Sequence, residues 1–508
     1  MKKVMGKYLN WGLSVLLGIG IFLFWYVAYP HALSYHEQYQ LFLWTWDYFV
    51  ERISLPGGFA DWLGEFIVQF YYIEWLGALL LALLFVAMQR ITGTVLRDTI
   101  FSENWIIRTV PVILVAIVLW LMGDINVLLS LPVAIILALA LACIRLSKPL
   151  SWIDLLIVPI AYWLIGPAVW IYVIIRVIQI GWKHLWTAGW LVAVQLMAYA
   201  WLLPQWPLQQ VMTGLNYYRI PLHYPQLSGY DKDMYELIRL DYLVRNERWD
   251  EIVKRAGEHQ VKTPFWSNCV NLALSQKRLL ADRMFDFWQS GEEALIMPRT
   301  RDLTSMLPSA ETFWRLGMVN SAQRYMFDTQ ESILNARKSG RCTKRIAECM
   351  IVNGHYQTAA KQLNLLKKSL FYRSWAKDAE AMMKDEATIN NHPVYGRLRQ
   401  LRYKENFLYS YEELDKMFGL LFIRSQETGD RSQEVNKMAL DYFMAQMLLK
   451  GNLQGFQQYM GAVQQYGGYR QMPLGYQDVM RCIQMQGRVP DSPYAKYVQR
   501  MTERRAER

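Results

Sequence analysis

Cysteine is scarce in this chain, and the spacings that hold metal ions or nucleotides are absent from it. Only five of the 508 residues are cysteine, which excludes a scaffold built on disulfides. The Cys and His spacings match no zinc site, the seven histidines form no HExxH motif, and neither a Walker loop nor a dinucleotide fingerprint occurs. Aromatic residues make up 14% of the chain, which excludes disorder. The sequence therefore indicates a folded protein without a recognisable zinc or nucleotide motif.

Charge is also scarce, but only in the first part of the chain. Residues 1–210 hold 11 Lys and Arg and 10 Asp and Glu, whereas residues 211–508 hold 43 and 33. Nearly all of the formal net charge of +11 therefore belongs to the second part. Acidic residues are interspersed among the basic ones there, so we expect no nucleic-acid partner and favour an acidic or phosphate-rich one.

Seven apolar runs in the charge-poor part predict helices that cross a membrane. The first run follows three lysines and lacks a small-residue cleavage site, which favours an uncleaved anchor over a signal peptide. Pro159, Gly166 and Pro167 interrupt the fifth and sixth runs, which form either two spans or one broken, re-entrant hairpin. The runs lie near residues 9–29, 72–89, 106–122, 127–144, 153–165, 168–180 and 185–203.

Basic residues sort to one side of these predicted spans. With the N-terminus in the cytoplasm, ten Lys and Arg fall in inner segments, and only Arg52 falls in an outer loop. Seven spans place everything after Pro204 on the outer side, whereas the loss of the sixth span would move it to the cytoplasm. We expect a multi-pass protein of a bacterial inner membrane, surrounded by membrane lipids, with a periplasmic C-terminal domain.

The first outer loop, residues 31–71, is too polar to cross a membrane and too long for a turn. Helical periodicity predicts two amphipathic helices, over 37–53 and 59–71, with Leu55-Pro56-Gly57-Gly58 between them. Such helices tend to lie flat on a membrane surface. We expect the acidic side chains of the loop to face water or a cavity, namely Glu37, Asp47, Glu51, Asp61 and Glu65.

The order of these elements resembles the start of the GT-C glycosyltransferases, in which a membrane anchor precedes an acidic segment, two juxtamembrane helices and a second span. His36-Glu37-Gln38-Tyr39 matches the acidic segment, although His36 replaces its first acid, and Asp124 in Gly123-Asp124-Ile125-Asn126 matches the acid of the next outer loop. The resemblance covers about residues 8–205 and implies seven spans, but the family's usual further spans are not evident here. The combination HEQYQLF, LPGG and WLGALLLALL also resembles an uncharacterised family of Bacteroidota inner-membrane proteins.

The GT-C resemblance implies that a sugar is taken from a polyprenyl-phosphate donor at the outer membrane face. Glu37 would be the general base on an acceptor hydroxyl, Asp124 the second acid, and His36 a proton or phosphate partner. Arg52 is a candidate for the lipid phosphate, and the alternative is an ion pair with an acid of its own helix. No motif requires a cofactor, and a divalent metal beside the phosphate stays an open alternative.

From residue 233 onward, helix-period runs come in pairs, and no strand pattern persists. Short polar turns join the pairs at 246–248, 276–278, 317, 353–355 and 450–452. With segments such as NGHYQTAAKQL and NERWDEIVKRA, this arrangement resembles tetratricopeptide repeats. One helix pair cannot bury its apolar stripe alone, so we expect stacked pairs that bind a protein partner or act as a rigid spacer.

The sequence thus predicts an all-α protein with a GT-C-like membrane domain over residues 1–205, a membrane-surface linker over 206–232 and a TPR-like repeat domain over 233–508. The favoured function is glycosyl transfer from a lipid-linked sugar, with the repeats recruiting acceptor or partner proteins. The competing hypothesis is a non-enzymatic, membrane-anchored scaffold of an envelope or secretion complex. Transport is a third class, but the internal repeat symmetry of transporters is not evident.

Overall fold

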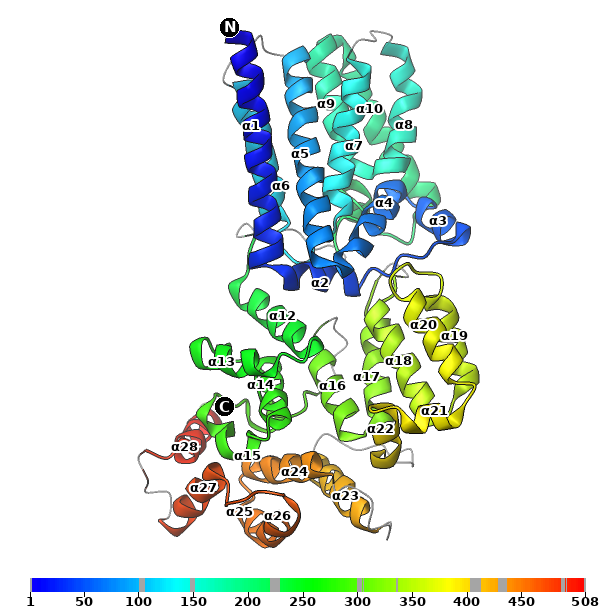
Figure 1. Cartoon of the computed structure of the whole chain (residues 1–508). Helices are drawn as coiled ribbons and strands as arrows, with labels where there is room; N and C mark the ends of the chain where they lie inside the picture. The colour runs from blue at the N-terminus through cyan, green and yellow to red at the C-terminus, as the bar shows by residue number, and fades with distance from the viewer. Residues whose placement is uncertain are drawn as a thin grey trace. The chain divides into compact units, whose positions relative to one another are not determined.

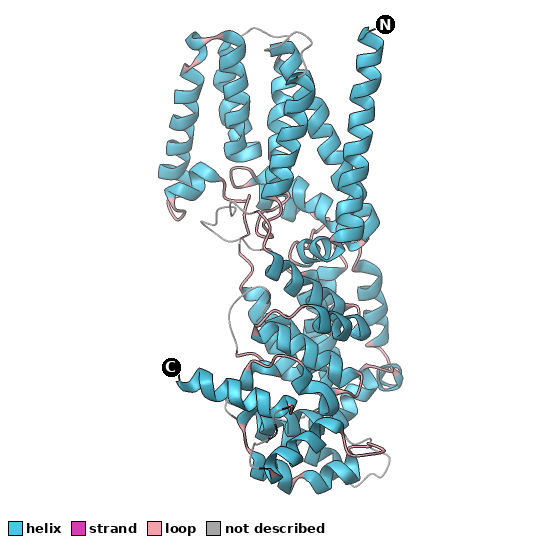
Figure 2. Cartoon of the chain, turned by 90° about the vertical axis from the view of Figure 1, so that its left-hand side faces the viewer, coloured by secondary structure: helices cyan, strands magenta, loops and turns pink. Residues whose placement is uncertain are grey.

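The chain is built from helices. The computed structural model describes residues 2–508 except 100–105, 147–150, 220–228, 299–303, 305, 335–336, 403–412, 428–435, 486–488, 490 and 507–508. It is 78% helical, and the only extended pairing among the described residues is an isolated bridge between Val127 and Tyr218 (Figure 2). The all-α class predicted from the sequence is therefore confirmed.

Two compact units make up the fold, and each is discontinuous in sequence. The first, here called the membrane unit, comprises Met1–Tyr235 together with Ile333–Gly340 and Lys367–Ser374. The second, the hairpin unit, comprises Glu236–Ser332, Arg341–Leu366 and Trp375–Arg508. The first unit therefore includes two short segments from the predicted repeat region. Part of the predicted linker, residues 220–228, lies outside the described residues.

The membrane unit combines a bundle of long helices with three shorter ones near one end of it (Figure 1). The bundle contains α1 (Lys2–Leu23), α5 (Glu74–Thr99), α6 (Ile106–Leu121), α7 (Ser130–Arg145), α8 (Asp154–Ile165), α9 (Val169–Ile180) and α10 (Trp186–Met197). The shorter helices are α2 (Pro30–Gln38), α3 (Trp46–Ile53) and α4 (Gly58–Val68), and α11 (Leu208–Thr213) follows the bundle.

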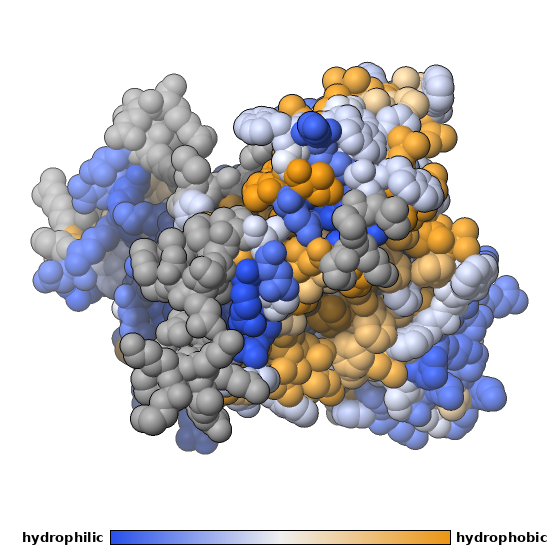
Figure 3. Space-filling view, turned by 90° about the horizontal axis from the view of Figure 1, so that it is seen from above, coloured by the Kyte–Doolittle hydropathy of each residue, from blue (hydrophilic) through white to orange (hydrophobic). Residues whose placement is uncertain are grey.

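Four helical segments of this unit are long and apolar enough to cross a membrane: Trp11–Ala28, Glu74–Thr99, Ser151–Ile180 and Trp182–Leu202. Two further apolar helices, Thr109–Leu121 and Ser130–Arg145, are shorter. Large apolar side chains are exposed on the bundle, among them Leu16, Ile160 and Trp201, and apolar surface is prominent in the view from above (Figure 3). Such surface is unfavourable in water and suits contact with lipid. The count of seven spans remains a prediction.

The segment Ser151–Ile180 reverses direction rather than running straight. The Arg176 guanidinium lies 3.1 Å from the Asp154 carboxylate, although the two residues are 22 positions apart and would be about 33 Å apart in one continuous helix. The reversal occurs at Gly166, whose φ of +68° is readily adopted only by glycine. The Tyr217 hydroxyl donates to the carbonyl of Ile165 at this turn. Both predicted alternatives, two spans or a re-entrant hairpin, contain such a reversal.

Asp154 also binds three basic residues at the end of this hairpin that lies away from Gly166. Its carboxylate accepts from Arg145, Arg176 and His184, at 3.5, 3.1 and 2.9 Å. Asp154 is fully buried, and the ends of α7 and α9 and the segment before α10 meet at it. The Asp154 carboxylate therefore holds together three elements whose arrangement the sequence does not predict.

The predicted helix over 37–53 is wrong in its middle. Helix α2 ends at Gln38, and the chain then runs without helix until Thr45. Two backbone bonds explain the break, because the Leu41 N–H donates to the Lys338 carbonyl and the Trp44 N–H to the Lys368 carbonyl. The second predicted helix, over 59–71, is confirmed as α4 and a following 3₁₀ turn.

The hairpin unit contains helix pairs around all five predicted turns, although the helix after the turn at 276–278 is short, because it spans only Leu280–Arg283 before a 3₁₀ turn. Three of its helices, α12, α18 and α20, begin with one to four residues that belong to the membrane unit. The helices are α12 (Lys232–Arg245), α13 (Trp249–Glu258), α14 (Pro264–Gln276), α15 (Leu280–Arg283), α16 (Met306–Leu316), α17 (Val319–Glu331), α18 (Gly340–Asn353), α19 (Tyr356–Leu366), α20 (Arg373–Met382), α21 (Glu386–Asn391), α22 (Tyr395–Leu401), α23 (Leu414–Glu427), α24 (Lys437–Lys450), α25 (Leu453–Gln458), α26 (Met460–Tyr466), α27 (Leu474–Gln484) and α28 (Pro493–Ala506).

The five predicted turns share one helix-ending geometry. In each, a residue with positive φ follows the helix, and the next N–H donates to the carbonyl five positions earlier, the pattern of a Schellman cap. The positive-φ residues are Glu247, Arg278, Gly317, Gly354 and Gly451, and the five N–H groups belong to Arg248, Leu279, Met318, His355 and Asn452. The recurrence supports a repeated hairpin, while its assignment to tetratricopeptide repeats remains a prediction.

A buried ion network joins the helices of the hairpin unit. Arg345 donates to Glu311 at 2.8 Å and to Glu348 at 2.8 Å, and Arg341 donates to Asp241 at 2.6 Å. Burial alone would raise the pKa of Glu311, but the arginines oppose it and hold the pKa at about 2. Helices α12, α16 and α18 therefore meet through charges that are paired inside the fold.

Candidate functional site

Helix α2 positions both residues of the predicted acidic motif. It begins at Pro30, which favours the first helical position because its missing N–H has no acceptor there. His36 and Glu37 lie in its last turn, and both are buried, with 5% of each exposed. They therefore face the interior of the membrane unit rather than bulk water.

His36 is held by an arginine from the predicted linker. Arg219 Nη2 lies 3.2 Å from His36 Nδ1, and since a guanidinium only donates, Nδ1 must accept and the ring must carry its proton on Nε2. Burial and the Arg219 charge lower the pKa of His36 to about 3. The imidazole is therefore neutral and presents one N–H donor.

Arg219 is itself a buried cation with spare donors. Its guanidinium lies 4.7 and 4.8 Å from the ring centres of Tyr35 and Tyr39. Its Nε and Nη1 atoms are buried and have no hydrogen-bond partner in the part of the chain that the structure describes. Burial lowers its pKa, yet arginine stays charged in proteins. An anion that reached these donors would be bound strongly.

The neutral His36 predicts a specific pH dependence of stability. Because its pKa is near 3 in the folded protein and about 6.5 when unfolded, stability is complete above pH 6.5 and falls as the pH drops below it. The expected loss at pH 5 is about 2 kcal/mol. Thermal unfolding of the detergent-solubilised protein should give a lower unfolding midpoint at pH 5 than at pH 7.5. This difference in midpoint should be smaller for His36→Gln than for the wild type. Replacing the exposed His355 by Gln should leave the difference as in the wild type, and an unchanged difference in His36→Gln would contradict the assignment.

Glu37 is bound by a residue far along the chain. The Tyr372 hydroxyl donates to Glu37 Oε1 at 2.7 Å, and Tyr372 belongs to the segment Lys367–Ser374 of the membrane unit. Stacking supports this contact, because the ring of Phe371 lies 5.1 Å from that of Tyr72. The carboxylate of Glu37 therefore has a fixed orientation.

Arg52 lies in a second buried cluster. Its Nε donates to Glu65 at 2.9 Å, and Glu65 also accepts from Tyr48 and, at 2.8 Å, from Arg337. Arg337, in the segment Ile333–Gly340, also pairs with Asp61. Burial raises the pKa of Asp61 to about 6 against the effect of Arg337. For Glu65, burial acts in the same direction, but Arg52 and Arg337 prevail and lower the pKa.

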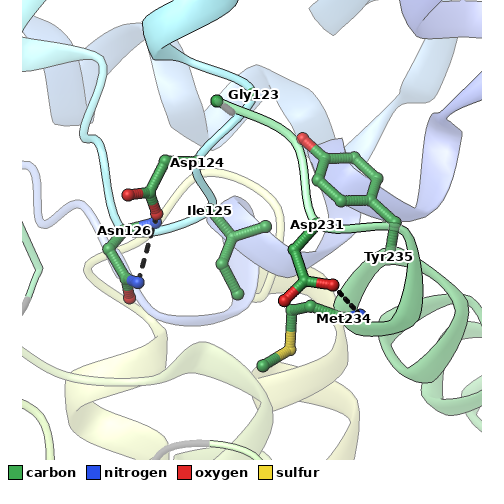
Figure 4. A pocket seen from close by; sticks show the side chains of 8 residues that line it. Gly123, Asp124, Ile125, Asn126, Asp231, Met234 and Tyr235 are labelled. Atoms are coloured by element: carbon green, nitrogen blue, oxygen red, sulfur yellow. Dashed lines mark hydrogen bonds between the residues drawn. The ribbon is translucent and has the colours of Figure 1, made fainter. Parts of the chain in front are cut away.

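Asp124 lines a small pocket of about 60 Å³ with Asp231, Met234 and Tyr235 (Figure 4). Its Oδ1 accepts from the N–H of Asn126 at 2.9 Å, and Asp231 accepts from that of Met234 at 3.1 Å. The Asn126 side-chain amide also donates to Asp124, at 3.2 Å, so each carboxylate is bound within its own turn, as Figure 4 shows. The pocket is too small for a lipid-linked sugar.

The predicted site residues fall into two groups. His36 and Glu37 lie together with Arg219, and the Arg219 N–H donates to the Asn126 carbonyl at 2.7 Å, which links them to the turn of Asp124. Arg52 is engaged by Glu65 instead, and its contact with Glu51 is longer, at 3.7 Å. No cluster of three or more His, Cys, Asp or Glu that could hold a metal occurs among the described residues.

Sequence reasoning missed Arg219, Arg337 and Tyr372. Arg219 sits in the linker directly after two tyrosines, and a cation among aromatic residues beside a membrane span was the available signal. Arg337 and Tyr372 had no such signal, because they lie about 270 to 335 positions beyond the residues that they contact.

One comparison with known proteins finds a match to this chain. No curated protein and no solved structure matches it. One family model, described as a family of unknown function and named DUF6057, matches residues 7–508. That match includes the helices that are long and apolar enough to cross a membrane, the site of α2 and the hairpin unit. The chain therefore belongs to the DUF6057 family.

Proposed function

We propose that the protein is a GT-C-like membrane glycosyltransferase that takes sugar from a polyprenyl-phosphate donor. The observation that carries the proposal is the buried Arg219, whose two spare donors lie beside the neutral His36. Arg219 thereby takes the phosphate-binding role first assigned to Arg52, which Glu65 already engages. The distribution of Lys and Arg supports an inner-membrane protein with its hairpin unit in the periplasm.

The proposed reaction uses this chain's residues as follows. The oxygen of an acceptor hydroxyl bonds to the anomeric carbon while the bond from that carbon to the phosphate oxygen breaks. Glu37 takes the hydroxyl proton, and Tyr372 keeps its carboxylate oriented. The leaving phosphate retains the bonding electrons, and Arg219 and the Nε2–H of His36 stabilise its charge. Asp124 is a supporting residue, since it holds the turn to which Arg219 is bound.

The direct test is replacement of Glu37 by Gln in cells that carry the variant as their only copy. Loss of a general base costs about 10²- to 10⁴-fold in rate, so the extracytoplasmic glycan made by this protein should nearly disappear. Asp47→Asn is the matched control, because Asp47 is an exposed acid of the same loop. Unchanged glycan in a Glu37→Gln strain with normal protein levels would rule out this role.

A non-enzymatic scaffold is the second candidate, and a separate observation favours it. The charges of the first loop already bind partners inside the unit: Glu37 binds Tyr372, and Asp61 and Glu65 bind Arg337. Such charges serve to hold two distant segments in place, and the hairpins would then gather partner proteins. Photo-crosslinkers placed at the exposed Lys361 and Lys377 in intact membranes should capture the same partner in fixed proportion. Absence of a common product would contradict the scaffold.

A further inference from the structure

The hairpin unit contains a pocket of about 390 Å³ that is lined by four cations. Arg278 comes from the turn after α14, Arg315 from α16, Arg397 from α22 and Lys437 from the first turn of α24. Among the described residues that line it, there is no carboxylate. The volume falls in the range of pockets that hold small ligands.

Two of these arginines are fixed in position by the fold. Arg278 donates to Asp441 at 3.1 Å and lies over the ring of Tyr469. Arg315 donates to Glu247 at 2.7 Å and lies over the ring of Trp249. These contacts hold both guanidinium groups at the pocket, so little rotamer entropy is lost when they bind a ligand.

The other two cations have no such partners. Arg397 and Lys437 make no hydrogen bond or ion pair with the residues that the structure describes. Four cations against the carboxylates of Asp441 and Glu247 leave a net charge of +2 around the pocket. The N-terminus of α24, at Lys437, adds the positive end of a helix dipole.

Three helices, α14, α16 and α22, present their C-terminal turns to the pocket and so bring the negative ends of their dipoles. In each of them a carbonyl near the end already accepts from a backbone N–H beyond the helix: Leu274 from Leu279, Phe313 from Met318 and Leu398 from Arg402. The preference for an anion therefore rests on the four cations rather than on the helix ends. The electrostatics of the pocket favour a ligand that carries two negative charges.

We propose that this pocket binds a phosphate ester through its dianionic phosphate group. Phosphate presents tetrahedrally arranged acceptors and suits donors that arrive from several elements, whereas a carboxylate is satisfied by one planar fork. The apolar side chains of Leu398, Leu401 and Met438 lie beside the cations and would contact the body of the ester. This site is separate from the Arg219 site and does not depend on the proposed function.

The test measures binding to the purified full-length protein by isothermal titration calorimetry. The probes are inorganic pyrophosphate and glucose 1-phosphate, with glucose as the uncharged control. We expect saturable binding of both phosphates that weakens at least tenfold in the double variant Arg397→Gln/Lys437→Gln. The control Lys361→Gln/Lys377→Gln removes two exposed cations of the same unit and should bind as the wild type.

The source of the phosphate is distinguished by a second pair of probes, dihexanoyl phosphatidic acid and dihexanoyl phosphatidylcholine. Preference for glucose 1-phosphate supports a soluble ester, and preference for phosphatidic acid supports a lipid headgroup; either preference must be lost in the double variant. Absence of binding to every phosphate, or equal binding by the wild type and the double variant, would overturn the proposal.

Discussion

Replacing Arg337 with alanine is expected to destabilise the membrane unit by about 3–5 kcal/mol, the usual cost of breaking a buried ion pair from one side. Arg337 is 4% exposed at its side chain and lies between the carboxylates of Asp61 and Glu65. Without it, two buried acids share only Arg52, and one of them must take up a proton or unfold its surroundings. The loss should appear as a lower unfolding midpoint of the detergent-solubilised protein.

A matched control lies beside Arg337 in the same segment. Lys338 is exposed, and its backbone carbonyl, which the substitution leaves in place, accepts from the Leu41 N–H. Lys338→Ala should therefore change stability by less than about 0.5 kcal/mol. Adding Asp61→Asn to the Arg337→Ala variant should restore part of the loss, because one buried charge is removed. Equal midpoints for Arg337→Ala and Lys338→Ala would contradict the role of the ion cluster.

The Glu311→Ala variant should destabilise the hairpin unit by about 3–5 kcal/mol. Glu311 is 4% exposed and faces both Arg345 and Arg341. Its low pKa means that stability is gained above pH 4.5 and lost as the pH falls towards 2. Removal of the carboxylate takes this gain away at neutral pH and leaves two buried cations with fewer partners.

Hydrogen exchange measured by mass spectrometry can locate this effect. We expect faster exchange in α16 and α18, which carry Glu311 and Arg345, with the helices of the membrane unit unchanged. Glu331→Ala removes an exposed acid of the neighbouring α17 and should leave exchange as in the wild type. Unaltered exchange in α16 and α18 of the Glu311→Ala variant would show that the network does not stabilise these helices.

Local patterns were sufficient to predict the helix pairs of the hairpin unit. The turn at Asn353-Gly354-His355 follows from a glycine that ends one helix and an aromatic residue that begins the next, and both are neighbours in sequence. The same holds for Pro56 and Gly57 between α3 and α4. These features depend on residues within one or two turns of one another, which a single sequence displays directly.

Long-range contacts could not be predicted in this way. The break after Gln38 depends on the carbonyls of Lys338 and Lys368, and the residues near position 40 contain no pattern that predicts these partners. The acids Asp61 and Glu65 were expected to face water or a cavity, because their cation, Arg337, lies in another part of the chain. The motif at His36 and Glu37 was found from sequence, but its partners were not.

The same limit explains the choice of Arg52 as the phosphate ligand. It is the only cation of the predicted outer loops before residue 210, so charge counting selected it. The fold instead pairs it with Glu65 and brings Arg219 beside His36. The sequence therefore selected an arginine by its predicted topology, whereas packing decides which arginine has donors to spare.

The most direct test of the account is whether Arg219 binds the phosphate of a polyprenyl lipid. Native mass spectrometry of the solubilised protein should show polyprenyl monophosphate bound more tightly than polyprenol. Arg219→Gln should reduce the phosphate-dependent affinity at least tenfold, since a hydrogen bond to a charged group contributes about 1.5–3 kcal/mol. The control Arg97→Gln, which removes an exposed arginine of the same unit, should not. Equal affinities for polyprenyl phosphate and polyprenol, or unchanged affinity in a folded Arg219→Gln protein, would contradict the proposed site.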